Sequence, residues 1–260
     1  MNPKNLIQIS FLVLFAVNST AQNTTNIFSE GKEYVYRVTS IQANGDTLTC
    51  EKMILIGKDE EWQYQKKQSI LEIKYFPDTV NLKSYVDPRT AEEERKIKNL
   101  KKKARGKKGW DNYTWLKNEE VTGKIITDSS IWFHPPRSNQ YGYHYMNAYP
   151  EVNFNKLYIG GTWQSAIKIL RSIPSNEEFV GTTTNTFKVT EYLTTTFNGK
   201  TLDNCWRIKI KSVHSNKGET SAEYIFSETY GFLKMEHLFY DGVRINYVLE
   251  EVVSSLPHSE

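Results

Sequence analysis

The 260-residue sequence has few cysteines, and neither Cys50 nor Cys205 lies in the paired-cysteine spacing of a zinc site. It also lacks the Gly-x-Ser-x-Gly elbow of hydrolases, a phosphate-binding glycine loop and a dinucleotide-binding fingerprint. Its five histidines show no two-histidine helical spacing. We therefore expect no metal and no cofactor, and we expect a binding protein rather than an enzyme.

Long apolar runs are missing as well. Leu6 to Val17 is too short to span a bilayer, follows Lys4, and precedes Ser19-Thr20-Ala21, a small-x-small cleavage site. This pattern predicts a signal peptide over residues 1–21 and an exported protein, periplasmic or secreted. The residue immediately after the expected cleavage site is Gln22 and not a cysteine that could accept a lipid. No later segment reaches membrane-spanning length.

Acidic residues are absent from residues 95–108, which hold nine lysines or arginines. Asp87 and Pro88 can begin a helix there, and Gly106 and Gly109 can end it, so the sequence predicts a basic helical insertion over about 88–105, within residues 88–109. Lys101, Lys102 and Lys103 could touch an anionic envelope surface, although a solvated helix face is the simpler interpretation. Aromatic residues are not interleaved with this run, so we expect no nucleic-acid binding.

With 38% hydrophobic and 13% aromatic residues, the chain can build a packed core. Alternation of period two predicts strands over about 33–41, 47–56, 62–76, 123–134, 186–197, 204–214, 221–227, 233–239 and 243–249. Hairpins are favoured by four turn pairs: Asn44-Gly45, Asn198-Gly199, Lys217-Gly218 and Asp241-Gly242. We therefore predict one mainly β domain over residues 22–260, a curved antiparallel sheet or half-barrel.

Residues 135–162 form a long tyrosine-rich stretch that the pattern assigns to a loop. The following segment, Trp163 to Leu170, fits a helix or a strand equally well. Alternation places Cys205 on the face of Arg207 and Lys209, away from Ile208. Two free thiols are therefore favoured over a Cys50–Cys205 disulfide, because a disulfide needs both side chains to converge.

Candidate ligand-binding residues are Trp132, His134, Arg137, Tyr141, Tyr143 and Trp163. His134 and Arg137 stand at a strand-to-loop corner, where they could hold a carboxylate or phosphate or could simply satisfy loop carbonyls. The aromatic residues could line a pocket for an acyl chain, a peptide or a sugar, or could belong to ordinary packing. His237 is expected to be a satisfied core histidine.

Several short motifs, in a fixed order, resemble those of a known group of proteins. They are Ile131-Trp-Phe-His-Pro-Pro-Arg137, Tyr149-Pro-Glu-Val152, Gly160-Gly-Thr-Trp163, Gly199 with Cys205-Trp-Arg-Ile208, Tyr224-Ile-Phe-Ser-Glu228 and Tyr230-Gly-Phe-Leu-Lys-Met235. Over about 125–252 the chain resembles uncharacterised exported β-rich proteins of Gram-negative bacteria. It is more faintly similar to periplasmic half-barrel domains of the outer-membrane lipoprotein carrier type. The resemblance implies no catalytic residue.

Three functional hypotheses follow. The first is an exported cell-envelope protein that binds a hydrophobic or amphipathic ligand, such as a lipid or a lipoprotein segment, on a concave sheet face. The second is a glycan-binding or glycan-hydrolysing protein, for which Glu223, Glu228 and Glu236 are candidate carboxylates. The third is a structural or partner-binding module that uses a sheet edge.

Overall fold

The computed structural model describes residues 26–62, 67–77, 119–137, 139–169 and 179–254. Within these ranges the chain forms twelve strands and two short 3-10 helices. The strands of the first half are β1 (Lys32–Ile41), β2 (Thr47–Glu61), β3 (Ser69–Pro77), β4 (Glu119–Ile126), β5 (Ser130–Phe133) and β6 (Glu151–Asn153). Those of the second half are β7 (Thr162–Ile169), β8 (Gly181–Phe197), β9 (Lys200–His214), β10 (Gly218–Ser227), β11 (Gly231–Leu238) and β12 (Arg244–Ser254). The 3-10 helices are η3 (Asn139–Met146) and η4 (Phe154–Lys156).

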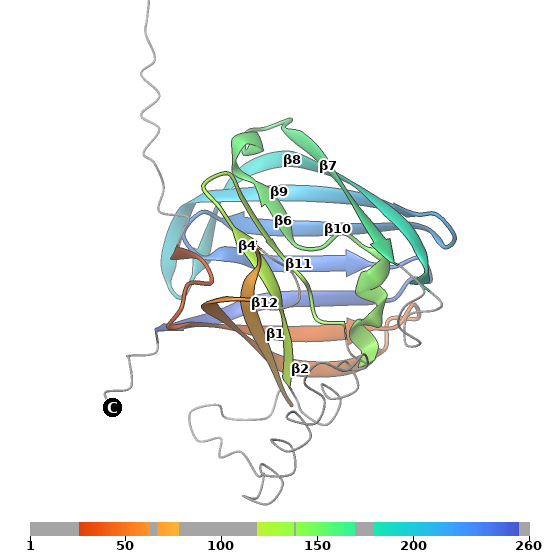
Figure 1. The fold of residues 1–260 in the computed structure, drawn as a ribbon, viewed down its shortest axis with the longest axis horizontal. Coiled ribbons are helices and arrows are strands. Elements are labelled where there is room, and N and C mark those ends of the chain that lie inside the picture. Colours follow the sequence, from red (N-terminus) through yellow and green to blue (C-terminus); the bar gives the residue numbers. More distant parts are fainter. Residues whose placement is uncertain (1–25, 63–66, 78–118, 138, 170–178, 255–260) are drawn as a thin grey trace, which may run out of the picture.

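All twelve strands belong to one antiparallel sheet with the order β6-β5-β4-β3-β2-β1-β12-β11-β10-β9-β8-β7. The sheet curls into a nearly closed barrel (Figure 1). Among the described residues, β6 pairs only with β5 and β7 only with β8, so the barrel stays open between β6 and β7. The predicted mainly β, curved antiparallel sheet is confirmed.

Alternation decides which side chains point inward. On β12, Ile245, Tyr247 and Leu249 are at most 4% exposed, whereas Val248 between them is 43% exposed. The same alternation on the other long strands gives a single large core inside the sheet. A small second cluster, Val35, Ile54 and Ile56 with Phe76, lies on the outer face of β1, β2 and β3.

The N-terminal described segment fills one part of the interior. Ile27 and Phe28 are fully buried, and the Phe28 ring packs against Tyr34 and Phe133 at centroid distances of 4.4 and 5.3 Å. The Phe28 amide donates to the Tyr34 hydroxyl at 3.0 Å. A side chain at Gly57 would collide with the Phe28 carbonyl, so the glycine permits this close approach.

The tyrosine-rich stretch fills another part of the interior and is more ordered than the sequence predicts. It contains η3, β6 and η4 rather than one long loop. After η3 the chain is tied to the sheet by hydrogen bonds: Thr220 Oγ1 donates to the Met146 carbonyl at 3.0 Å, and the Tyr224 hydroxyl donates to the Ala148 carbonyl at 3.2 Å. Much of the concave face is therefore occupied by the protein's own chain.

Two strand predictions were wrong in their limits. The predicted strand 123–134 is a hairpin, because the chain turns at Thr127, whose amide donates to the Ser130 carbonyl at 2.9 Å. The predicted strand 62–76 begins only at Ser69, whereas β2 continues to Glu61. The ambiguous segment after Gly161 is strand β7.

The predicted orientation of Cys205 is also wrong. Its side chain is fully buried in the core, on the side of Ile208. The neighbouring strand β8 has irregular register between Val189 and Glu191 and between Leu193 and Thr195, and simple alternation does not hold across such bulges. Cys205 is a free thiol, while the side chain of Cys50 lies outside the described residues.

Several predictions fall outside the described residues: the signal peptide over 1–21, the basic helix over 88–105 with Lys101, Lys102 and Lys103, and the domain limits that depend on them. They remain predictions. In the part of the chain that the structure covers, no helix has the length and apolar character needed to cross a membrane.

Candidate functional site

The six candidate residues fall into three places in the fold. Trp132 lies on β5, and His134 and Arg137 lie in the segment that leaves it. Tyr141 and Tyr143 belong to η3, and Trp163 lies on β7, at the open side of the barrel. The structure therefore does not gather them into one site.

His134 lies within a group of aromatic rings. Its ring centroid is 4.6 Å from that of Trp132, 5.0 Å from Tyr149 and 5.8 Å from Trp62. Burial, with a smaller contribution from the Arg137 charge, lowers the pKa of His134 to about 2. The imidazole is therefore neutral at physiological pH and packs as an aromatic ring.

Arg137 faces a buried carboxylate. Its Nε lies 3.7 Å from Glu120 Oε1, and its backbone amide donates to Glu120 Oε2 at 3.2 Å. The Tyr75 hydroxyl donates to the same Glu120 oxygen at 2.9 Å. The guanidinium also lies 5.9 Å from the centroid of the Tyr145 ring. These contacts balance the Arg137 charge within the protein and fix the corner after β5.

Tyr141 and Tyr143 anchor η3. The Tyr141 hydroxyl donates to Glu51 Oε2 and the Tyr143 hydroxyl donates to Asp241 Oδ2, both at 2.8 Å. The Tyr141 ring also stacks on Tyr75 at a centroid distance of 5.6 Å. Both tyrosines thus connect η3 to the wall of the barrel.

A histidine pair inside the barrel was not predicted from the sequence. The rings of His144 on η3 and His237 on β11 meet at a centroid distance of 4.5 Å, and both residues are almost fully buried. His144 Nε2 and the Tyr247 hydroxyl share a hydrogen bond of 2.7 Å. Neither ring nitrogen of His237 has a hydrogen-bond partner within the described chain. His237 is thus in the core as expected, but it is not satisfied there.

Burial dominates the protonation of this pair. It lowers the pKa of His237 to about 3, and it lowers the pKa of His144 well below the ordinary value, with a further contribution from His237. Within the described residues, no negatively charged partner compensates for the cost of a buried imidazolium. Both rings are therefore neutral over the physiological range.

Side chains of β6 and β7 approach each other across the open side of the barrel. Burial raises the pKa of the Glu151 carboxyl on β6, and the neighbouring Ser165 and Trp163 of β7 oppose this rise only in part. The Trp163 indole nitrogen is buried and has no hydrogen-bond partner within the described residues. The Trp163 ring stacks on Phe187 of β8 at a centroid distance of 4.8 Å with an interplanar angle of 7°. Further along the inward face of β7, Ser165 and Ile167 are only partly buried. We call Glu151, Trp163, Ser165, Ile167 and Phe187 the seam.

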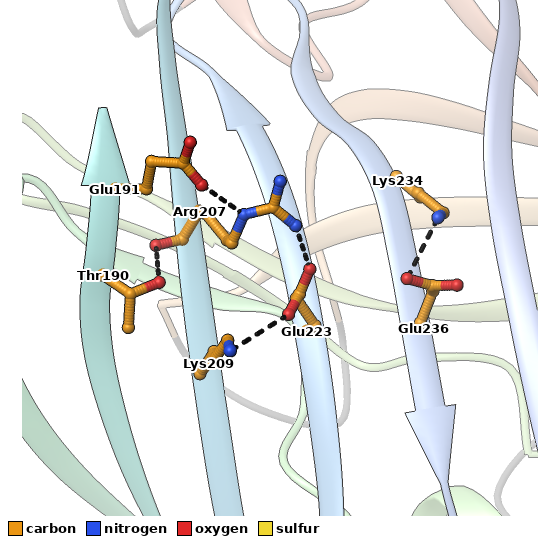
Figure 2. A network of polar contacts seen from close by, with 7 residues as sticks. All are labelled: Thr190, Glu191, Arg207, Lys209, Glu223, Lys234 and Glu236. Carbon is orange, nitrogen blue, oxygen red and sulfur yellow. Dashed lines mark hydrogen bonds and ion pairs between the residues drawn. The ribbon is translucent and has the colours of Figure 1, made fainter. Parts of the chain in front are cut away.

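The three carboxylates considered for glycan hydrolysis have other partners. Figure 2 shows Glu223 between Arg207 and Lys209 on the sheet surface, and Glu236 paired with Lys234. Glu228 accepts a hydrogen bond of 2.6 Å from the Trp206 indole. All three carboxylates thus have partners within the sheet, which gives no support to a pair of acids facing a cleft.

We predict a small effect for Arg207→Ala, although this side chain contacts both Glu191 and Glu223 (Figure 2). The Arg207 side chain is 33% exposed, and ion pairs in contact with water stabilise a fold by about 0.5–1 kcal/mol. Urea unfolding in low salt should show a loss of that size, and about 1 M salt should reduce it. A loss several times larger in both salts would contradict this assignment.

Among the described residues, no cluster of three or more histidine, cysteine, aspartate or glutamate side chains could hold a metal ion. The residues present therefore offer contacts of three kinds: aromatic surface, hydroxyl groups and a neutral imidazole pair.

Comparison with known proteins gave neither a matching family model nor a matching curated protein. Solved structures with a related chain path include a protein from Bacteroides fragilis described as exported with a YmcC-like fold (9% identity, TM-score 0.39, covering 86% of this chain and 96% of that one). A lipoprotein from Parabacteroides distasonis has 10% identity and a TM-score of 0.39, with 87% and 97% of the two chains covered. The hypothetical lipoprotein YmcC from Escherichia coli has 11% identity and a TM-score of 0.32, with 85% and 87% covered. These descriptions are of the kinds that the sequence resemblance named.

Proposed function

We propose that this chain is an exported protein of the bacterial cell envelope that binds the acyl part of a lipid or lipoprotein at the seam without catalysing a reaction. The observation that supports this proposal is the open sheet: β6 and β7 do not pair, and the inward face of β7 beside the opening carries Trp163 and the partly buried Ile167. Export is supported by the signal-peptide pattern of residues 1–21.

The seam suits an apolar chain better than a sugar. Trp163 and Phe187 are stacked on each other and buried, so they offer a sugar little free aromatic face, and Ile167 offers only aliphatic surface. Residues 27 and 28 and η3 fill other parts of the concave face, so we place the ligand along β7. Affinity would come from apolar area removed from water, about 25 cal/mol per Å².

Glu151 gives this proposal a mechanism. Its partly buried carboxyl lies beside Trp163 and Ser165 at the opening, so an entering chain has to displace it. In that position Glu151 would keep the apolar seam covered when no ligand is bound.

The test compares two glutamate substitutions on one strand. Ile167 faces the interior and Ala166 faces solvent, so Ile167→Glu places a charge in the seam whereas Ala166→Glu places the same charge outside. The protein, purified after export from a Gram-negative host, is examined by native mass spectrometry with organic extraction, and by titration with a fluorescent acyl probe. We expect an acyl species on the wild-type protein and on Ala166→Glu, and about tenfold weaker probe binding for Ile167→Glu.

Circular dichroism of both variants verifies that the sheet is intact. A wild-type protein that carries no acyl species and does not bind the probe would overturn the proposal. Equal probe binding by the two variants would overturn the assignment of the ligand to the seam.

A further inference from the structure

The most exposed large apolar side chains of the described chain are adjacent in sequence. Ile159 is 67% exposed and Tyr158 is 53% exposed, more than any other large hydrophobic residue in the described ranges. They lie in the turn between η4 and β7, and within the described chain neither side chain has a hydrogen bond or a ring contact. We call residues 157–161 the Tyr158–Ile159 tip.

The tip is held by its backbone. The Tyr158 amide donates to the Lys156 carbonyl at 2.9 Å, and the Gly161 amide donates to the Tyr158 carbonyl at 2.8 Å. Gly160 has a φ of 88°, a conformation that favours glycine, and its amide donates to the Val189 carbonyl of β8 at 2.9 Å. Because the turn is already ordered, presenting its two apolar side chains to a partner costs little further conformational entropy.

The position of the tip relates it to the opening of the barrel. It connects β6 to β7, the two edge strands that do not pair with each other, and lies at the top of the view in Figure 1. Three residues beyond Val189, the bulged part of β8 exposes another aromatic side chain, Tyr192, to 47%.

Two lysines lie close to the tip. Lys156 precedes it, and the exposed Lys188 of β8 lies opposite Thr162 at the start of β7. Of the acids on neighbouring elements, Glu191 pairs with Arg207 at 2.7 Å and Glu151 is partly buried beside Trp163 and Ser165. Asp128 is exposed in the β4–β5 turn, whose Ser129 carbonyl accepts a hydrogen bond from the Phe154 amide.

We propose that the Tyr158–Ile159 tip inserts into the headgroup region of an anionic lipid bilayer, reversibly. Tyrosine favours the boundary between headgroups and acyl chains, an aliphatic side chain beside it can enter the acyl region, and nearby lysines are attracted to anionic lipid. A protein partner is the less suitable occupant, because a stable protein interface buries about 800 Å² on each side and the tip offers two apolar side chains. Insertion would place the open side of the barrel next to the membrane. The proposal does not depend on a ligand at the seam.

The experiment measures cosedimentation of the exported, processed protein with vesicles of phosphatidylethanolamine and phosphatidylglycerol, and with phosphatidylcholine vesicles for comparison. We expect the wild-type protein to bind the anionic vesicles. The double variant Tyr158→Ser, Ile159→Ser should have a partition coefficient about tenfold lower. Val213→Ser is the matched control, because it removes an exposed aliphatic side chain of β9 (43% exposed) far from the tip, and it should bind as wild type does.

Absence of wild-type binding to anionic vesicles would overturn the proposal, as would equal binding by wild type and the double variant. Equal losses in the double variant and in Val213→Ser would also overturn it, since the effect would then not belong to the tip. Vesicle binding that depends on the tip, in a protein that carries no acyl species, would support this inference and count against the proposed ligand at the seam.

Discussion

Acidification from pH 7 to pH 5 is expected to destabilise the fold by about 4 kcal/mol or more, because His134 and His237 are held neutral inside it. In the unfolded chain a histidine takes up a proton near pH 6.5, whereas burial lowers the pKa of these two residues to about 2 and about 3. Each excluded proton costs about 2 kcal/mol at pH 5. Domains are stabilised by only about 5–15 kcal/mol in total, so the effect is large.

The sign of this pH dependence follows from whether the folded or the unfolded state binds more protons. The depressed pKa values mean that the stability from these groups is complete above pH 6.5 and is lost as the pH falls from there toward 3. His144, whose pKa is also lowered, adds to the loss. Glu151 opposes it as the pH falls through the raised pKa of its carboxyl, because the folded state holds that proton more tightly than the unfolded chain does. Among the described residues, the rings of Tyr141, Tyr224 and Tyr247 lie around the histidine pair. Burial raises the pKa of Tyr224 and Tyr247, so their hydroxyls stay neutral throughout this range.

Urea unfolding at pH 7, 6 and 5 measures this dependence, and His237→Phe isolates one contributor. The variant should reduce the slope by about 1 kcal/mol per pH unit and raise stability at pH 7 by about 1–3 kcal/mol, because two unpaired buried nitrogens are removed. Equal stability of the wild-type protein at pH 7 and pH 5 would contradict the neutral-histidine account. A loss of stability in His237→Phe at pH 7 would mean that the imidazole has partners in solution.

Gly57→Ala is expected to have the second large effect. The Cβ of an alanine at position 57 would overlap the Phe28 carbonyl oxygen, so either β2 or the segment at Phe28 has to move. Phe28 has a φ of 52°, which leaves its backbone little freedom to adjust. We expect a loss of about 3 kcal/mol in the free energy of unfolding, at the upper end of the overpacking range.

The control is the same substitution where there is room. At Gly142 in η3 the nearest atom to a new Cβ is 3.6 Å away, an ordinary contact, so Gly142→Ala should change stability by less than about 1 kcal/mol. Limited proteolysis would show whether Gly57→Ala releases the N-terminal segment. Similar urea midpoints for the two variants would refute the close approach of Phe28 and Gly57.

The features predicted correctly from the sequence are local ones. The C-terminal hairpin, with its turn at Asp241-Gly242, was predicted from an alternating apolar pattern and one glycine turn, and the structure has it as β11 and β12. The hairpin turns at Gly45, Gly199 and Gly218 were predicted in the same way, and all three glycines have a positive φ. A hairpin needs only neighbouring residues, so its sequence signal is complete.

What could not be predicted depends on residues far apart in the chain. Nothing near Phe28 indicates that it packs beside Gly57, and nothing near His144 indicates that it meets His237. The same limit applies to the candidate site: Trp163 and Glu151 come together only because the curled sheet brings its two edges close. Cys205 was misplaced because the register of β8 against β9 shifts at bulges that alternation does not reveal.

The pairing of β1 with β12 affects the order in which the sheet can form. Every other pair of adjacent strands in the sheet is also consecutive in sequence. Each of those pairs can therefore form as soon as its second strand has been made. Lys32 to Ile41, in contrast, pairs with Arg244 to Ser254, across the whole intervening chain. A chain delivered from its N-terminus would therefore hold β1 with one edge exposed until the last strand arrived, which makes the late stage of synthesis or translocation the interval most open to aggregation and proteolysis.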